Sequence, residues 1–191
     1  MMVDSSLSGG GVLRVATWNT GRSMGVGFVQ LLMYSNNINI DILCLQECDA
    51  DKNFKNIKDT LLNWGYQYVA NKHVVTLIRS DLALFIKPKG VLKHKSGRLL
   101  NIKIRTSGED LNVTNAYFKP RRGTFAHSPD EIKDDEERKQ MYKVINNIHK
   151  KGNMGIVCAD LNEIIIDRQS TTLNYTLNKL NGTYHPAKME K

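Results

Sequence analysis

Polar side chains that can bind a metal ion or a phosphate oxygen follow the apolar run 156–158, which is predicted to be a buried strand. Asp160 and Asn162 stand there with one residue between them. A carboxylate can accept a proton or bind a metal, and a carboxamide can donate a hydrogen bond to a phosphate-like oxygen. Asp and Asn are also the usual residues of turns, so an ordinary strand-to-loop turn is the alternative for this stretch alone.

Three further polar residues stand at the ends of other predicted strands. Asn19 and Glu47 follow the first two predicted strands of the chain, and Tyr117 ends the segment 111–117. A capping or turn role explains each residue singly. Their repetition at strand ends is what a catalytic site at the edge of a sheet would produce.

The first elements of the chain predict two neighbouring strands in one sheet. Apolar spacing predicts a strand over 12–18, a helix over 26–34 and a buried strand over 40–45. A strand, a helix and a strand in this order favour adjacent pairing, with the polar ends on one side of the sheet. A second helix is predicted over 54–64 and ends at Gly65.

Short strands are predicted through the middle of the chain. Turn signals at 88–90 and 107–110 separate segments whose spacing predicts a mainly antiparallel meander. These predicted strands are 66–69, 74–78, 82–86, 91–94, 99–105 and 111–117.

A long helix is predicted to bring the chain to the strand that ends in Asp160. Ser128 is an N-cap candidate, Pro129 takes the first helical position and Glu131 the capping-box position. The helix should run to about residue 149. Its expected core-facing residues are Ile132, Met141, Val144, Ile145 and Ile148. A short helix over 171–180 is predicted after the Asp160 strand.

Length and charge indicate one globular domain with a polyanionic partner. The 191 residues suit a single domain, and 41% hydrophobic with 24% charged residues excludes a disordered or collagen-like chain. The formal charge of +8 favours nucleic acid first, and an anionic membrane or phosphorylated small molecules second, while simple solubility is the alternative. A basic loop with Lys119, Arg121 and Arg122 could meet a phosphate backbone or be a solvated charge cluster.

Cysteine usage and the first residues bear on the compartment. Cys44, Cys48 and Cys158 lie in or beside apolar runs, and an odd number there predicts reduced, buried thiols in an intracellular protein, cytoplasmic or nuclear. Residues 1–11 are expected to be a flexible leader to a domain spanning 12–191, and they have no signal-peptide pattern. No apolar run approaches the roughly 20 residues of a membrane span.

Taken together, the strand ends resemble the endonuclease/exonuclease/phosphatase family, whose fold is that of deoxyribonuclease I. The matching segments are Thr17-Trp18-Asn19, Leu45-Gln46-Glu47, the run Asn-Ala-Tyr-Phe-Lys-Pro at 115–120, and Ala159-Asp160-Leu161-Asn162, where the family usually has Gly-Asp-Phe-Asn. The resemblance implies an α/β (α+β) fold, a four-layer α/β/β/α sandwich. Within the family, residues 160–168 look most like the endonuclease domains of non-long-terminal-repeat retrotransposons.

The resemblance also implies roles for the residues at the strand ends. Glu47, with Asn19 nearby, would hold a Mg²⁺ ion, for which Mn²⁺ could substitute. Asp160 would orient or deprotonate the attacking water. Asn162 and Tyr117 would donate hydrogen bonds to the phosphoryl oxygens. Gln46 is expected to be structural.

The chain departs from the family pattern near its end. The family closes with a strand ending in an Asp-His pair, and this sequence has no such pair. The five histidines are expected to be surface or structural residues: His73, His94, His127, His149 and His185. We therefore expect a C-terminally incomplete form, without the last strands and with an unpaired sheet edge.

Three functions follow from this combination of features. The first is a Mg²⁺-dependent phosphodiesterase, a DNA endonuclease domain of retroelement origin, whose activity is in question because the Asp-His pair is absent. The second is a catalytically dead remnant that binds nucleic acid. The third is a phosphatase or phosphodiesterase acting on a phosphorylated small molecule or lipid. DNA is the expected partner, and the sequence indicates no protein partner.

Overall fold

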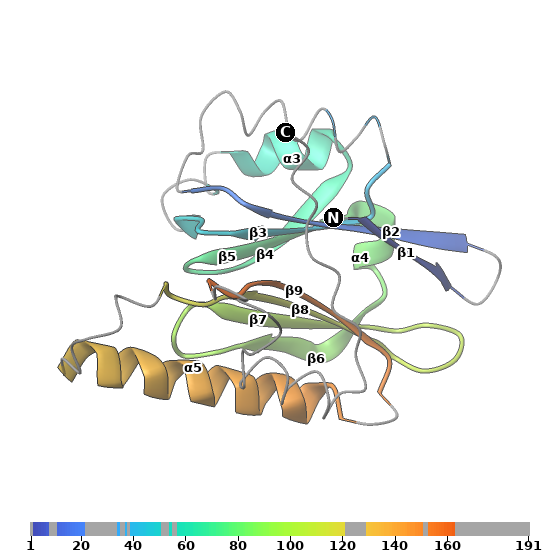
Figure 1. Cartoon of the computed structure of the whole chain (residues 1–191). Coiled ribbons are helices and arrows are strands. Elements are labelled where there is room, and N and C mark those ends of the chain that lie inside the picture. Colours follow the sequence, from blue (N-terminus) through green and yellow to red (C-terminus); the bar gives the residue numbers. More distant parts are fainter. Residues whose placement is uncertain are drawn as a thin grey trace.

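Two β-sheets packed face to face form the centre of the molecule, with a helix on each outer face (Figure 1). The computed structural model describes residues 2–7, 11–21, 34, 37, 39–50, 54, 57–120, 129–150 and 153–162. Helix α3 (Lys58–Asn63) covers one sheet and helix α5 (Pro129–Ile148) covers the other. The layers are therefore α/β/β/α, which confirms the expected fold class.

The first sheet has five strands in the order β1-β2-β3-β5-β4. Their bounds are β1 (Met2–Leu7), β2 (Gly11–Asn19), β3 (Ile42–Gln46), β4 (Tyr66–Asn71) and β5 (Val74–Arg79). Strands β2 and β3 pair in parallel, as the sequence predicts, and the other pairs are antiparallel. Strand β1 is a correction, because residues 1–11 were expected to be flexible. It forms by pairing along the edge of β2, a contact that local apolar spacing does not reveal.

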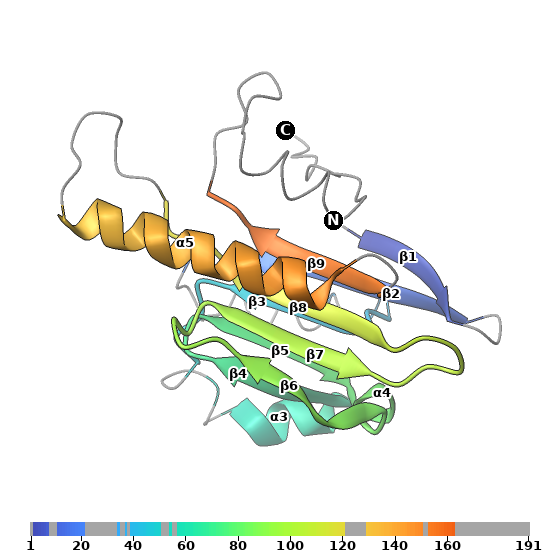
Figure 2. The same ribbon diagram turned by 90° about the horizontal axis from the view of Figure 1, so that it is seen from below.

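The second sheet has four strands in the order β6-β7-β8-β9. Their bounds are β6 (Ile86–Lys93), β7 (Leu99–Ile104), β8 (Leu111–Tyr117) and β9 (Gly155–Asp160). The predicted meander is antiparallel from β6 to β8, and β9 joins β8 in parallel. Figure 2 shows α5 running across the outer face of this sheet, over β8 and β9.

One predicted strand of the meander is wrong. Residues 82–86 do not form a strand, because Ser80–Ala83 form the short helix α4 and β6 begins only at Ile86. The backbone N–H of Leu82 donates to Asp81 Oδ1 at 2.8 Å, a local bond that favours a helical start over a strand. At α4 the chain leaves the first sheet and enters the second, so the meander is divided between the two layers.

Three apolar clusters hold the layers together. The first lies between the sheets, the second between the first sheet and α3, and the third between the second sheet and α5. Met141 and Ile145 of α5 are buried as predicted, and Val144 packs partly against them. Ile132 is wrong as a core residue, because it is 59% exposed. It lies in the first turn of α5, and Figure 1 shows this end of the helix extending beyond the sheet.

Strand β9 is less buried than the sequence predicts. Cys158 points into the core between the sheets, but Val157 is 40% exposed. Within the described residues β9 is the last strand of its sheet, so only one of its edges is paired there. The three cysteines are free and buried, which confirms the prediction of unpaired, buried thiols. No helix in the described part of the chain is long and apolar enough to cross a bilayer.

Candidate active site

The four polar strand ends meet at one edge of the two sheets. Parallel pairing places Asn19 of β2 beside Gln46 of β3, and Tyr117 of β8 beside Asp160 of β9. Because the sheets pack face to face, the two pairs of strand ends also meet across the layers. The fold thus brings together residues that are as much as 141 positions apart in the sequence.

Asn19 bridges the two carboxylates of the site. Its Nδ2 donates to Glu47 Oε1 at 2.9 Å and to Asp160 Oδ2 at 2.6 Å. Its Oδ1 accepts a hydrogen bond from the backbone N–H of Gly21 at 2.8 Å, which fixes the orientation of the carboxamide. The bridge links the first sheet to the second and sets the relative position of the two carboxylates.

The backbone of Glu47 turns out of β3 in a left-handed conformation, with φ of 54°. Such a conformation costs a residue with a Cβ about 1–2 kcal/mol, so the surrounding contacts must hold it. Thr20 Oγ1 donates to the carbonyl oxygen of Gln46 at 3.0 Å, and the N–H of Cys48 donates to the carbonyl oxygen of His73 at 3.0 Å. Both neighbours of Glu47 are therefore anchored.

Asp160 and Asn162 form a compact turn at the end of β9. Asp160 Oδ1 accepts the backbone N–H of Asn162 at 3.1 Å, and Asp160 Oδ2 accepts Asn162 Nδ2 at 3.2 Å. Asn162 Nδ2 also donates to the carbonyl oxygen of Phe118 at 2.6 Å. Asn162 has φ of 47°, a conformation that Asn tolerates better than most residues. The Asp160 carboxylate is thus oriented by Asn19 and Asn162 together.

Tyr117 is buried beside these carboxylates. Burial raises the pKa of its phenol, as do the charge of Glu47, a hydrogen bond to Glu47 and the charge of Asp160, while the Arg98 guanidinium opposes the rise. The guanidinium carbon of Arg98 lies 5.1 Å from the centre of the Tyr117 ring. The phenol therefore stays protonated at neutral pH and is a hydrogen-bond donor.

The predicted basic loop is only partly described. Lys119 forms an ion pair with Asp134 of α5, so its ammonium group is directed toward the helix. Arg121 and Arg122 lie outside the described residues. The sequence analysis missed Arg98, which stands before β7 in a segment without any motif. The contact of Arg98 with the Tyr117 ring becomes visible only in the folded structure.

Gln46 and two of the histidines have structural roles. Gln46 is buried, and its Nε2 donates to Thr17 Oγ1 at 2.9 Å and to Asn115 Oδ1 in the opposite sheet at 2.8 Å. His149 Nε2 lies 2.7 Å from Thr114 Oγ1, and His94 Nδ1 lies 2.9 Å from Ser96 Oγ. These contacts agree with the structural roles expected from the sequence. His127 and His185 lie outside the described residues.

The donor set at this edge fits Mg²⁺. Among the described residues there is no group of three or more His, Cys, Asp or Glu side chains that could hold a metal. Mg²⁺ needs fewer protein ligands, because it keeps several waters and binds through one or two carboxylates. Glu47 and Asp160, joined by Asn19, provide such carboxylates. Asn19 presents its nitrogen to them, so its carboxamide bridges and positions the carboxylates.

Comparisons with known proteins identify the fold. No family model and no curated protein matches the sequence. Among solved structures, the AP endonuclease LMAP from Leishmania major has a TM-score of 0.63 and 15% identity, over 86% of this chain and 66% of that chain. The endonuclease domain of TRAS1, a telomere-specific non-LTR retrotransposon, has a TM-score of 0.57 and 16% identity, over 88% of this chain and 70% of that chain.

A phosphatase has the same architecture. The mannosyl-6-phosphatase Bt3783 of Bacteroides thetaiotaomicron has a TM-score of 0.57 and 14% identity, over 87% of this chain and 70% of that chain. The present chain thus spans about two thirds of the length of these three proteins. Identities this low establish a common fold, and substrates vary within it. The chain therefore has the same fold as these three proteins, which agrees with the deoxyribonuclease I-like fold expected from the sequence.

Proposed function

We propose that this chain is a Mg²⁺-dependent phosphodiesterase domain that hydrolyses the DNA backbone. One observation carries the proposal: five polar residues from four strand ends converge on one edge, linked by the Asn19 bridge. These residues are Asn19, Glu47, Tyr117, Asp160 and Asn162. The net charge of +8 supports a polyanionic substrate.

The protein groups would share the work of phosphate hydrolysis. Asp160, whose carboxylate is oriented by three N–H groups, would orient the attacking water and accept its proton. The protonated phenol of Tyr117 would donate a hydrogen bond to a phosphoryl oxygen as negative charge builds there. Asn162 would donate a second one, with the phosphoryl oxygen replacing Phe118 as acceptor.

Glu47 is the residue that would hold Mg²⁺, with Asn19 keeping it in place beside Asp160. A bound Mg²⁺ supplies positive charge that stabilises the transition state of phosphoryl transfer, and Mn²⁺ could replace it. The left-handed backbone at Glu47 is consistent with a carboxylate held for function, because strained conformations concentrate at functional sites.

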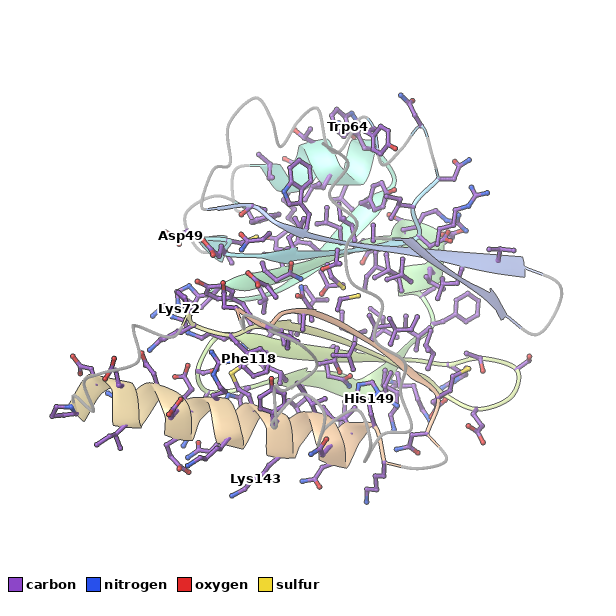
Figure 3. All side chains as sticks on the ribbon, viewed as in Figure 1. Asp49, Trp64, Lys72, Phe118, Lys143 and His149 are labelled. Carbon is purple, nitrogen blue, oxygen red and sulfur yellow. The ribbon has the colours of Figure 1, made fainter. Side chains whose placement is uncertain are left out.

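A plasmid-nicking assay tests the proposal. Supercoiled DNA with Mg²⁺ would be incubated with the wild type and with Glu47→Gln, Asp160→Asn and Asp49→Asn. Asp49 is a matched control, an exposed carboxylate two residues beyond Glu47 at the same edge (Figure 3). We expect nicking to fall by roughly 100-fold or more in the first two variants and to persist in the control. Activity unchanged in either site variant would refute the assigned roles.

We also propose that this chain has a retroelement origin and an intracellular location. The resemblance of residues 160–168 to retrotransposon endonucleases and the structural likeness to the TRAS1 domain support a retroelement origin. The free, buried cysteines support an intracellular location, in the cytoplasm or nucleus.

A nucleic-acid-binding remnant without activity is the second candidate. The net charge of +8 supports binding to nucleic acid, and the absence of an Asp-His pair from the sequence supports the loss of activity. It would bind DNA without Mg²⁺, and its affinity would fall by orders of magnitude between about 50 and 200 mM salt.

The likeness to a mannosyl-6-phosphatase supports a third candidate, a phosphatase on a phosphorylated small molecule or lipid. Hydrolysis of a phosphate monoester without nicking of the plasmid would favour it.

A further inference from the structure

Arg138 is a buried cation on the face of α5 that packs against the second sheet. The residue is only 6% exposed. Arginine is almost never buried to this extent unless its charge is paired or hydrogen bonded. Its position therefore indicates that the guanidinium group has specific partners in the protein.

Two of those partners are the backbone segments that carry the candidate active site. Arg138 Nη1 donates to the carbonyl oxygen of Leu161 at 3.0 Å, and Nη2 donates to the carbonyl oxygen of Lys119. Leu161 stands between Asp160 and Asn162, and Lys119 follows Tyr117 by two positions. One side chain thus ties the end of β8 to the end of β9.

Phe118 completes this contact. The Arg138 guanidinium carbon lies 5.3 Å from the centre of the Phe118 ring, and Figure 3 shows Phe118 between α5 and the sheet. The backbone N–H of Phe118 donates to the carbonyl oxygen of Asp160 at 2.9 Å, while its own carbonyl accepts Asn162 Nδ2 at 2.6 Å. Phe118 therefore connects Arg138 to Asp160 at the end of β9 and to Asn162 just beyond it.

Neighbouring residues of α5 contact the same region. Asp134 pairs with Lys119, and a Glu137 carboxylate oxygen lies 3.4 Å from Arg98 Nε, whose guanidinium covers Tyr117. The helix thus supports the site through three successive contacts. Arg138 differs from the other two because it is buried and because it binds backbone on both strand ends.

We propose that Arg138 is a positioning residue that fixes Asp160 and Asn162 relative to Tyr117. Its planar guanidinium directs two donors at two carbonyl oxygens in fixed directions, which a lysine ammonium cannot reproduce. The Leu161 contact holds the chain immediately before the left-handed Asn162. The inference rests on the proposed phosphodiesterase function for its catalytic consequence.

Kinetics of three variants test the catalytic consequence. Arg138→Met removes the donors and retains bulk, Arg138→Lys retains the charge, and Lys139→Met changes an exposed neighbour on the same helix as a control. We expect kcat to fall roughly 10- to 100-fold in Arg138→Met with little change in KM, because misplaced groups slow chemistry more than binding. Arg138→Lys should recover part of the loss, and Lys139→Met should match the wild type.

Hydrogen exchange tests the positioning independently of activity. In Arg138→Met the amide of Phe118 should exchange at least about tenfold faster, while amides of the central strand β7 keep their wild-type rates. Should Arg138→Met fail to fold, the same comparison is made with Arg138→Lys. If the wild type shows no hydrolysis, the proposed function fails and the exchange rates alone decide the role of Arg138. Wild-type exchange at Phe118 together with wild-type kcat would overturn the inference.

Discussion

Acid should destabilise this fold through one buried histidine. His149 follows α5, and its Nε2 lies 2.7 Å from Thr114 Oγ1, whose hydroxyl donates to Asn101 Oδ1 at 2.8 Å. Since the hydroxyl hydrogen is given to Asn101, the His149 ring must donate from Nε2. Burial lowers the pKa of His149 from 6.5 to about 4, so the ring is neutral in the folded protein at neutral pH.

The sign and size of the effect follow from proton linkage. The unfolded chain binds a proton at His149 with a pKa near 6.5, whereas the folded chain binds it only near 4. Stability therefore falls as the pH drops below about 6.5 and levels off below about 4. At about 1.4 kcal/mol per pKa unit, the full loss is about 3 kcal/mol, of which about 2 kcal/mol occurs between pH 7 and pH 5.

Urea unfolding at pH 7 and pH 5 measures this loss. The wild type is compared with His149→Gln, which retains a polar group near Thr114 but cannot titrate in this range. The wild type should lose about 2 kcal/mol more than His149→Gln on acidification. His94→Gln is the matched control, because the His94 ring is less buried than that of His149. This variant should still show most of the loss of stability that the wild type shows between pH 7 and pH 5. Equal losses in the wild type and His149→Gln would refute the reasoning.

Two further substitutions should lower stability. An alanine Cβ at Gly155 would lie 2.1 Å from His149 Nδ1, so Gly155→Ala should lower the stability by about 2 kcal/mol in a thermal melt. Gly108→Ala is the control and should cost far less, because the added Cβ would meet no atom within 4 Å. Equal melting temperatures for the two variants would contradict the packing at Gly155. Asn115 is fully buried, donates to two backbone carbonyls of the opposite sheet and accepts from Gln46. Asn115→Leu should cost about 3 kcal/mol in urea unfolding, and a cost near zero would show that the sheets do not depend on this link.

Local patterns predicted most of the elements. The apolar runs before Asn19 and Glu47 identified β2 and β3, and the capping signals around Pro129 identified α5. Such patterns are legible because each depends on side chains within a few positions along the chain. Patterns also identified the polar residues at the strand ends, because a turn residue after an apolar run is a local feature.

The corrections concern features that depend on distant partners. Strand β1 forms through pairing with β2, Ile132 is exposed because α5 extends beyond its sheet, and Val157 is exposed because β9 is the last described strand of its sheet. The helix α4 at 80–83 replaced a predicted strand because the chain changes layers there. Apart from the local bond between Asp81 and Leu82 in α4, these outcomes depend on residues outside the segment itself.

The sequence by itself determined which residues could do chemistry and at which strand ends they stand. The tertiary structure alone decided that Asn19 bridges Glu47 and Asp160, that Arg138 holds the segments after β8 and β9, and that Lys119 turns toward α5. The physical reason is that strand ends are specified by local propensity, whereas their meeting depends on two sheets packing through a common core. A hydrogen bond between residues 141 positions apart exists only once that core has formed.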